Sequence, residues 1–62
     1  MNVYECTYNW KGGIHTFFTS ARSKVQAKGN TLKRLADEIG INIGILHKEF
    51  DGHKDNWKVV EK

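Results

Sequence analysis

The alternation of apolar and polar residues predicts strands in the first third of this chain. Apolar and polar side chains alternate over residues 3–9, and residues 14–19 are rich in β-branched and aromatic types. Gly12 and Gly13 lie between the two runs and can adopt positive φ angles. Two such runs joined by a short glycine-containing loop predict a β-hairpin.

The pattern then changes to the spacing of a helix. Ser23 is followed three residues later by Gln26, which is the arrangement of a capping box, so we expect a helix to begin at about Lys24. From there to residue 39 the apolar residues keep one helical face. These residues are Val25, Leu32, Leu35, Ala36 and Ile39.

Two divisions of this helical region are consistent with the sequence. Residues 29–31 (Gly-Asn-Thr) could end a first helix and cap a second one over residues 31–39. Alternatively, one helix over residues 24–39 passes through the glycine at a cost of about 1 kcal/mol. Gly40 ends the helix in either case.

Residues 41–50 also fit two elements. Isoleucine at every second position from 41 to 45 is a strand pattern, whereas Asn42 as an N-cap with Leu46 and Phe50 behind it suits a helix. Residues 57–61 (WKVVE) predict a final strand that pairs with the hairpin.

The fold class predicted is α+β: an N-terminal β-hairpin, a helical centre and a short C-terminal strand that completes the sheet. The centre is either a helix-turn-helix (residues 31–39 and 42–50) or one long helix followed by a strand, which would give the order ββαββ. With 62 residues we expect one small domain, 1–62, with too little room for an enzyme pocket built from several elements.

Composition narrows the class of protein further. Ten Lys and Arg against seven Asp and Glu give a net charge of +3, a mild bias that suits nucleic acid. The single cysteine, Cys6, excludes an internal disulfide and favours a reducing compartment, and its place in the alternation predicts a core residue. No apolar run approaches the roughly 20 residues of a membrane span, and no signal-peptide pattern is present, so we expect a cytoplasmic protein without membrane contact.

The segment TLKRLADEIGINIGILHKEF, residues 31–50, carries a resemblance to a known family. Ala36 four residues before Gly40, with apolar residues on both sides of the turn, resembles small phage and bacterial helix-turn-helix DNA-binding modules, and the similarity extends to Trp57. Residues 3–39 resemble small phage accessory proteins built from a β-hairpin, a helix and a strand. Ile43, Ile45 and Glu49 depart from the first pattern, because recognition helices usually present polar and basic side chains there.

The first resemblance implies a non-enzymatic accessory protein, of phage or prophage type, that binds duplex DNA and regulates transcription in the host cytoplasm. A homodimer would be usual for such a module. The second resemblance implies the alternative, a module that binds and inhibits a host protein through an exposed strand edge or the aromatic hairpin face. The residues assigned to nucleic-acid binding are Thr31, Lys33, Arg34, Asn42, His47, Lys48, His53 and Lys54.

Other chemistry has little support in the sequence. His47 and His53 are six residues apart, whereas zinc ligands usually come in closer pairs accompanied by more cysteine. Asp37 and Glu38 are adjacent and would point about 100° apart on a helix, so they cannot act as a catalytic pair. No glycine-rich phosphate loop and no nucleophile constellation is present. We therefore expect no catalytic residue, no metal and no cofactor.

Overall fold

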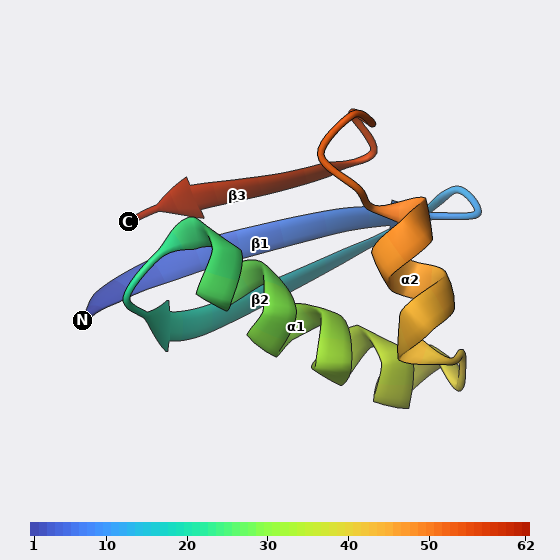
Figure 1. The fold of residues 1–62 in the computed structure, drawn as a ribbon, viewed down its shortest axis with the longest axis horizontal. Helices are drawn as coiled ribbons and strands as arrows, with labels where there is room; N and C mark the ends of the chain where they lie inside the picture. The colour runs from blue at the N-terminus through green and yellow to red at the C-terminus, as the bar shows by residue number, and fades with distance from the viewer.

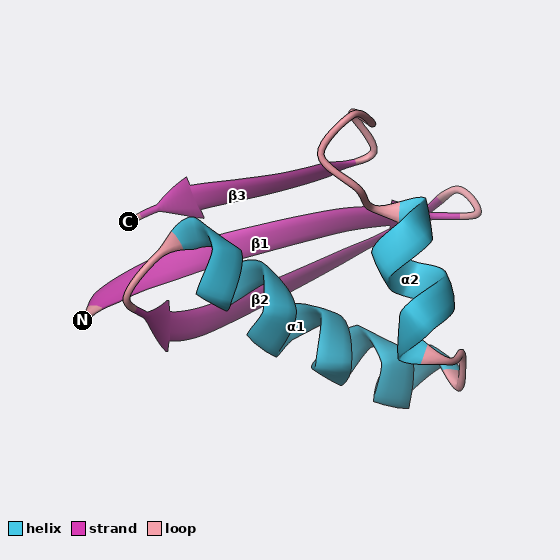
Figure 2. Ribbon diagram, in the orientation of Figure 1, coloured by secondary structure: helices cyan, strands magenta, loops and turns pink.

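The computed structural model describes all 62 residues as a three-stranded antiparallel sheet with two helices. Figure 2 shows both helices on the same side of the sheet. The strands lie in the order β2-β1-β3, so the N-terminal strand is central and the other two form the edges. The elements are β1 (Asn2–Trp10), β2 (Gly13–Ala21), α1 (Lys24–Ile39), α2 (Ile43–Glu49) and β3 (Trp57–Glu61). The predicted α+β fold, with a hairpin first and a strand last, is confirmed.

The hairpin closes through a two-residue turn in which both residues have positive φ. Lys11 has a φ of 49° and Gly12 a φ of 83°, as a type I′ turn requires. The turn sets Trp10 opposite Gly13 and fixes the register of the whole β1–β2 ladder. β1 then pairs with β3 from Tyr8 opposite Trp57 to Tyr4 opposite Glu61.

Because side chains alternate across a strand, each strand sends every second residue toward the helices. On β1 these are Tyr4, Cys6 and Tyr8, all buried. α1 crosses this face of the sheet, and α2 follows the C-terminal end of α1 and lies near the hairpin turn (Figure 1). The core formed between the two layers consists of Tyr4, Cys6, Tyr8, Phe17, Ala21, Ala27, Leu32, Leu35, Leu46, Phe50 and Val59.

α1 is a single helix of sixteen residues, so the prediction of a break at residues 29–31 is wrong. Its start is fixed by the predicted capping box: Ser23 Oγ accepts from the N–H of Gln26 at 3.2 Å, and the Gln26 side chain accepts from the N–H of Arg22 at 2.7 Å. The hydroxyl of Thr31 is directed back into the helix and donates to the carbonyl of Ala27 at 2.9 Å. It therefore cannot cap a second helix.

Residues 43–49 form a helix, so the alternative order ββαββ, with a strand over 41–50, is wrong. Leu46 and Phe50, four residues apart, are fully buried, whereas Ile45 is 54% exposed. The apolar residues at helical spacing thus reach the core, and the alternation of the isoleucines does not determine the backbone. The helical centre combines one feature of each predicted architecture: an unbroken first helix and a helical second segment.

Candidate functional site

α1 and α2 are joined by a short turn whose geometry is determined by two residues. Gly40 has a φ of 69°, and its N–H donates to the carbonyl of Ala36 at 2.9 Å, which ends α1. Asn42 then caps α2, because its side-chain oxygen accepts from the N–H of Gly44 at 2.8 Å. A Cβ on Gly44 would lie 3.1 Å from that oxygen, so the glycine keeps room for the cap.

α2 is anchored on one side and free on the other. Leu46 and Phe50 pack into the core, where the Phe50 ring lies 5.0 Å from Tyr8 and 6.3 Å from Trp10, centroid to centroid. The opposite side presents Ile45, His47 and Lys48 to solvent. A helix held in this way can offer its outer face to a flat partner or to a groove in DNA.

A shallow cleft separates the outer surface of α1 from the start of α2. It has a volume of about 390 Å³ and is lined by Lys33, Ala36, Asp37, Ile41 and Ile43. Lys33 is therefore the cation of α1 that belongs to the same surface as α2. Asp37 lines the same cleft, so the cleft carries one positive and one negative side chain.

The structure contradicts the predicted role of Thr31, which is fully buried. Its hydroxyl lies 2.6 Å from the hydroxyl of Tyr8 and donates to the carbonyl of Ala27. The prediction placed Thr31 at a helix N-terminus, where backbone amides suit phosphate. Because α1 begins seven residues earlier, at Lys24, Thr31 lies in mid-helix and faces the sheet.

Two further predicted binding residues serve the fold. Arg34 donates to the carbonyl of Phe18 at 2.9 Å, and its guanidinium carbon lies 5.3 Å from the centroid of the Phe17 ring. This residue connects α1 to the edge of β2 through one nitrogen of its guanidinium group. Asn42 likewise uses its carbonyl oxygen as the cap of α2.

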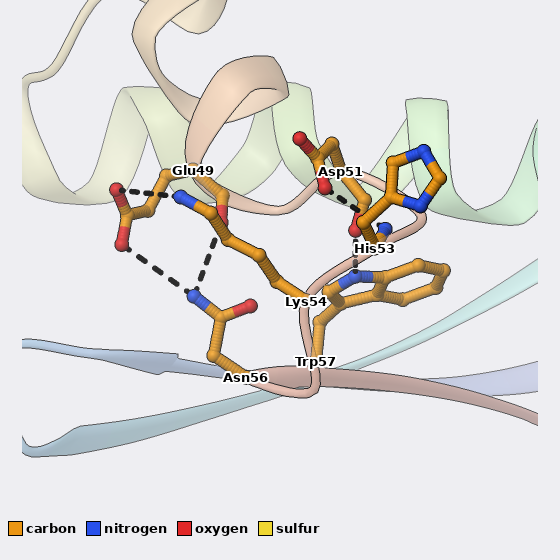
Figure 3. A network of polar contacts seen from close by, with 6 residues as sticks. All are labelled: Glu49, Asp51, His53, Lys54, Asn56 and Trp57. Atoms are coloured by element: carbon orange, nitrogen blue, oxygen red, sulfur yellow. Dashed lines mark hydrogen bonds and ion pairs between the residues drawn. The ribbon is translucent and has the colours of Figure 1, made fainter.

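The last two predicted residues, His53 and Lys54, lie in the loop that connects α2 to β3 (Figure 3). The loop is held by Trp57, which donates from its indole nitrogen to the carbonyl of Asp51 at 2.7 Å. Asn56 donates to the carbonyl of Glu49 at 3.1 Å, and Lys54 lies 3.8 Å from the Glu49 carboxylate. Lys54 is thus paired on the surface, and the side chain of His53 is exposed.

Besides the three residues that stabilise the fold, the other five predicted residues are exposed and fall into two groups. Lys33, His47 and Lys48 lie on the α1–α2 pair, and His53 and Lys54 lie in the following loop. No group of three His, Cys, Asp or Glu side chains that could hold a metal ion lies together, around His47 and His53 or elsewhere.

A second basic surface, which the sequence reasoning did not identify, lies between the N-terminal half of α1 and β3. The ammonium of Lys28 lies 3.9 Å from the centroid of the Trp57 ring, and Lys24 and Lys58 line the same groove. Burial lowers the pKa of Lys28, although the charge of Asp51 opposes this effect. The i,i+4 spacing of Lys24 and Lys28 was a visible signal, but their proximity to β3 depends on the tertiary structure.

Neither helix is of the length and hydrophobicity needed to cross a lipid bilayer. Comparison with models of protein families, with curated proteins and with solved structures finds no match to this chain.

Proposed function

We propose that this chain is a small non-enzymatic protein that binds duplex DNA through the outer face of α2. The observation that carries the proposal is the helical state of residues 43–49 behind a left-handed Gly40. A strand over these residues would have left the chain without a second helix to place in the groove of DNA. Helix α1, the turn at Gly40 and helix α2 follow one another in the order that a helix-turn-helix requires, which supports the proposal, although α1 is longer than the resemblance implied.

The contacts available to DNA are few and of two kinds. Lys48, Lys33 and Lys54 are exposed cations suited to phosphate oxygens, and His47 and Ile45 occupy the outer face of α2. An exposed isoleucine can contact the methyl group of thymine in the major groove. Thr31 is excluded from this set because it is buried, whereas Arg34 and Asn42 are exposed and each uses one polar atom to stabilise the fold.

The number of cations sets the strength expected of the complex. Three phosphate contacts give a slope of log K against log salt of about −2.7, since each contributes about −0.9. Such a module binds weakly alone, and a second copy on an adjacent half-site would raise the affinity. A regulatory role and a phage or prophage origin belong to the same proposal, on the strength of the helix-turn-helix resemblance.

The test is fluorescence anisotropy with a labelled duplex of mixed sequence, titrated at several salt concentrations. We expect binding at tens of micromolar protein in low salt, and Lys48→Gln should reduce the salt slope by about one. Lys11→Gln is the matched control, because Lys11 lies in the hairpin turn. The absence of binding at low salt, or equal effects of the two variants, would contradict the proposal.

A further inference from the structure

The outer side of β3 is an edge of the sheet to which no side chain forms a hydrogen bond. The N–H of Asn9 bonds to the carbonyl of Asn56, and the N–H of Lys62 bonds to the carbonyl of Val3, at 2.9 and 2.8 Å. Because bonding residues alternate in an antiparallel ladder, the residues at 58 and 60 also bond to β1. The N–H and C=O groups of Trp57, Val59 and Glu61 therefore point away from the sheet.

The opposite edge, on β2, differs in that one of its outward residues has a hydrogen-bond partner. By the same alternation, counted from the Trp10–Gly13 pair beside the turn, Phe18 directs its carbonyl outward. Arg34 of α1 donates to this carbonyl at 2.9 Å and packs over the neighbouring Phe17. A charged side chain laid on an edge strand is a recognised way to prevent further pairing. No side chain of the protein makes such a bond to the edge of β3.

A groove of about 460 Å³ runs beside the free edge of β3. Its residues carry three positive charges and no negative charge, and none of the three lysines takes part in an ion pair. Val25 of α1 is 82% exposed and contributes an apolar side chain to this groove. The groove is lined by Lys24, Val25 and Lys28 of α1 and by Trp57, Lys58 and Val59 of β3.

We propose that the free edge of β3 accepts an extended acidic segment of another protein, which adds to the sheet as a fourth strand. The backbone of β3 supplies the hydrogen bonds, and the lysines of the groove select carboxylates. This surface is separate from the outer face of α2, so the inference does not depend on binding to DNA. A nucleic acid strand would satisfy the lysines but would leave the alternating N–H and C=O groups of the edge unmatched.

The alternation of β3 defines the side chains that an added strand should carry. A residue opposite Val59 lies on the side of α1 and meets Val25, so an apolar side chain fits there. Residues opposite Lys58 and Trp57 lie on the two faces of the sheet, within reach of Lys58 and Lys28, and should be acidic. The preferred segment is therefore a short run of carboxylates around one β-branched residue.

The probe for this proposal is a capped seven-residue peptide with a central valine flanked by glutamates, titrated into the ¹⁵N-labelled full chain. In the free protein, the amides of Trp57, Val59 and Glu61 should exchange with solvent faster than those of Lys58 and Val60. Binding of the peptide should slow the exchange of the three outward amides at least tenfold, because they become bonded. Lys24→Glu should weaken binding at least tenfold, and Lys11→Glu, the same charge change in the hairpin turn, less than twofold.

Two matched peptides make the result decisive. Methylation of the backbone nitrogens that face β3 should abolish binding, and replacement of the glutamates by lysines should also abolish it. Binding that survives N-methylation and slows none of the three amides would overturn strand addition and leave only a patch for polyanions. No change in the spectrum at millimolar peptide would also overturn it. Neither result bears on the effect of Lys48→Gln on duplex DNA.

Discussion

The hydroxyl groups of Tyr8 and Thr31 form a buried polar pair between the sheet and α1, and its removal should reduce stability. The Tyr8 hydroxyl lies 2.6 Å from Thr31 Oγ1, which donates onward to the carbonyl of Ala27. Both residues are fully buried, so neither hydroxyl can exchange its partner for water. Thr31→Val keeps the shape of the side chain and removes only the hydroxyl.

The structure gives different magnitudes for the two halves of the pair. In Thr31→Val the Tyr8 hydroxyl keeps only the carbonyl of Lys28, at 3.3 Å, so the loss should be about 1–3 kcal/mol. In Tyr8→Phe the Thr31 hydroxyl still donates to Ala27, and the loss should be about 1 kcal/mol. The double variant should lose less than the sum of the two by about 1 kcal/mol, because the two groups share one bond.

The pH dependence supplies an independent check. Burial raises the pKa of Tyr8 to about 12 from an ordinary value of 10.0. The unfolded chain therefore loses this proton first, so the contribution of Tyr8 to stability is constant well below pH 10 and is lost as the pH rises toward 12. Two pK units correspond to about 2.7 kcal/mol, and Tyr8→Phe should not show this part of the loss. The raised pKa of Cys6, also a result of burial, affects both proteins alike.

The assay is urea unfolding followed by tryptophan fluorescence, at neutral pH and at several values between 10 and 12. Thr31→Val should lower the midpoint and leave the affinity for DNA unchanged. Equal stability of Thr31→Val and the parent chain would refute the buried pair. A loss of DNA binding without a loss of stability would also refute it, and would restore Thr31 as a contact residue.

Further predictions concern the helices. Gly29→Ala should stabilise the protein by about 0.5–1 kcal/mol, because Gly29 lies within α1 and no atom lies within 4 Å of an added Cβ. Gly40→Ala should destabilise it by about 1–2 kcal/mol, because Gly40 has equal space but a φ of +69°; thermal unfolding that moved both variants the same way would contradict this assignment. Phe50→Ala removes the buried ring that holds α2 to Tyr8 and Trp10, and a loss of about 3–5 kcal/mol should leave much of the chain unfolded by circular dichroism; a folded variant with unchanged α2 resonances would contradict it.

Local signals were sufficient to predict much of the fold. The alternation and paired glycines of the hairpin, the Ser23–Gln26 capping box and the apolar run at residues 57–61 each depend on neighbours in sequence. Residues 41–50 could not be assigned because alternation and helical spacing coexist there. Tertiary packing determines the helix, because Leu46 and Phe50 are both buried in the core when they lie on one side of it.

The candidate site was less predictable, because its residues are defined by partners far along the chain. The residues around Thr31 in the sequence do not indicate that its hydroxyl is buried against that of Tyr8, which is 23 residues away. The same holds for Arg34 and Phe18, which are separated by 16 residues. The basic groove depends on β3 returning beside the start of α1, a relation that charge counts along the sequence cannot express.

Cys6 has a practical consequence of its own. It is the only thiol of the chain, it lies at the middle of the central strand, and none of its surface is exposed. An alkylating reagent can therefore reach it only when α1 lifts away from β1, and the rate of modification would report the frequency of that opening in native buffer. The modification rate of Cys6 thus reports local opening of the protein, and the effects of bound ligands on this opening could be compared without any added label.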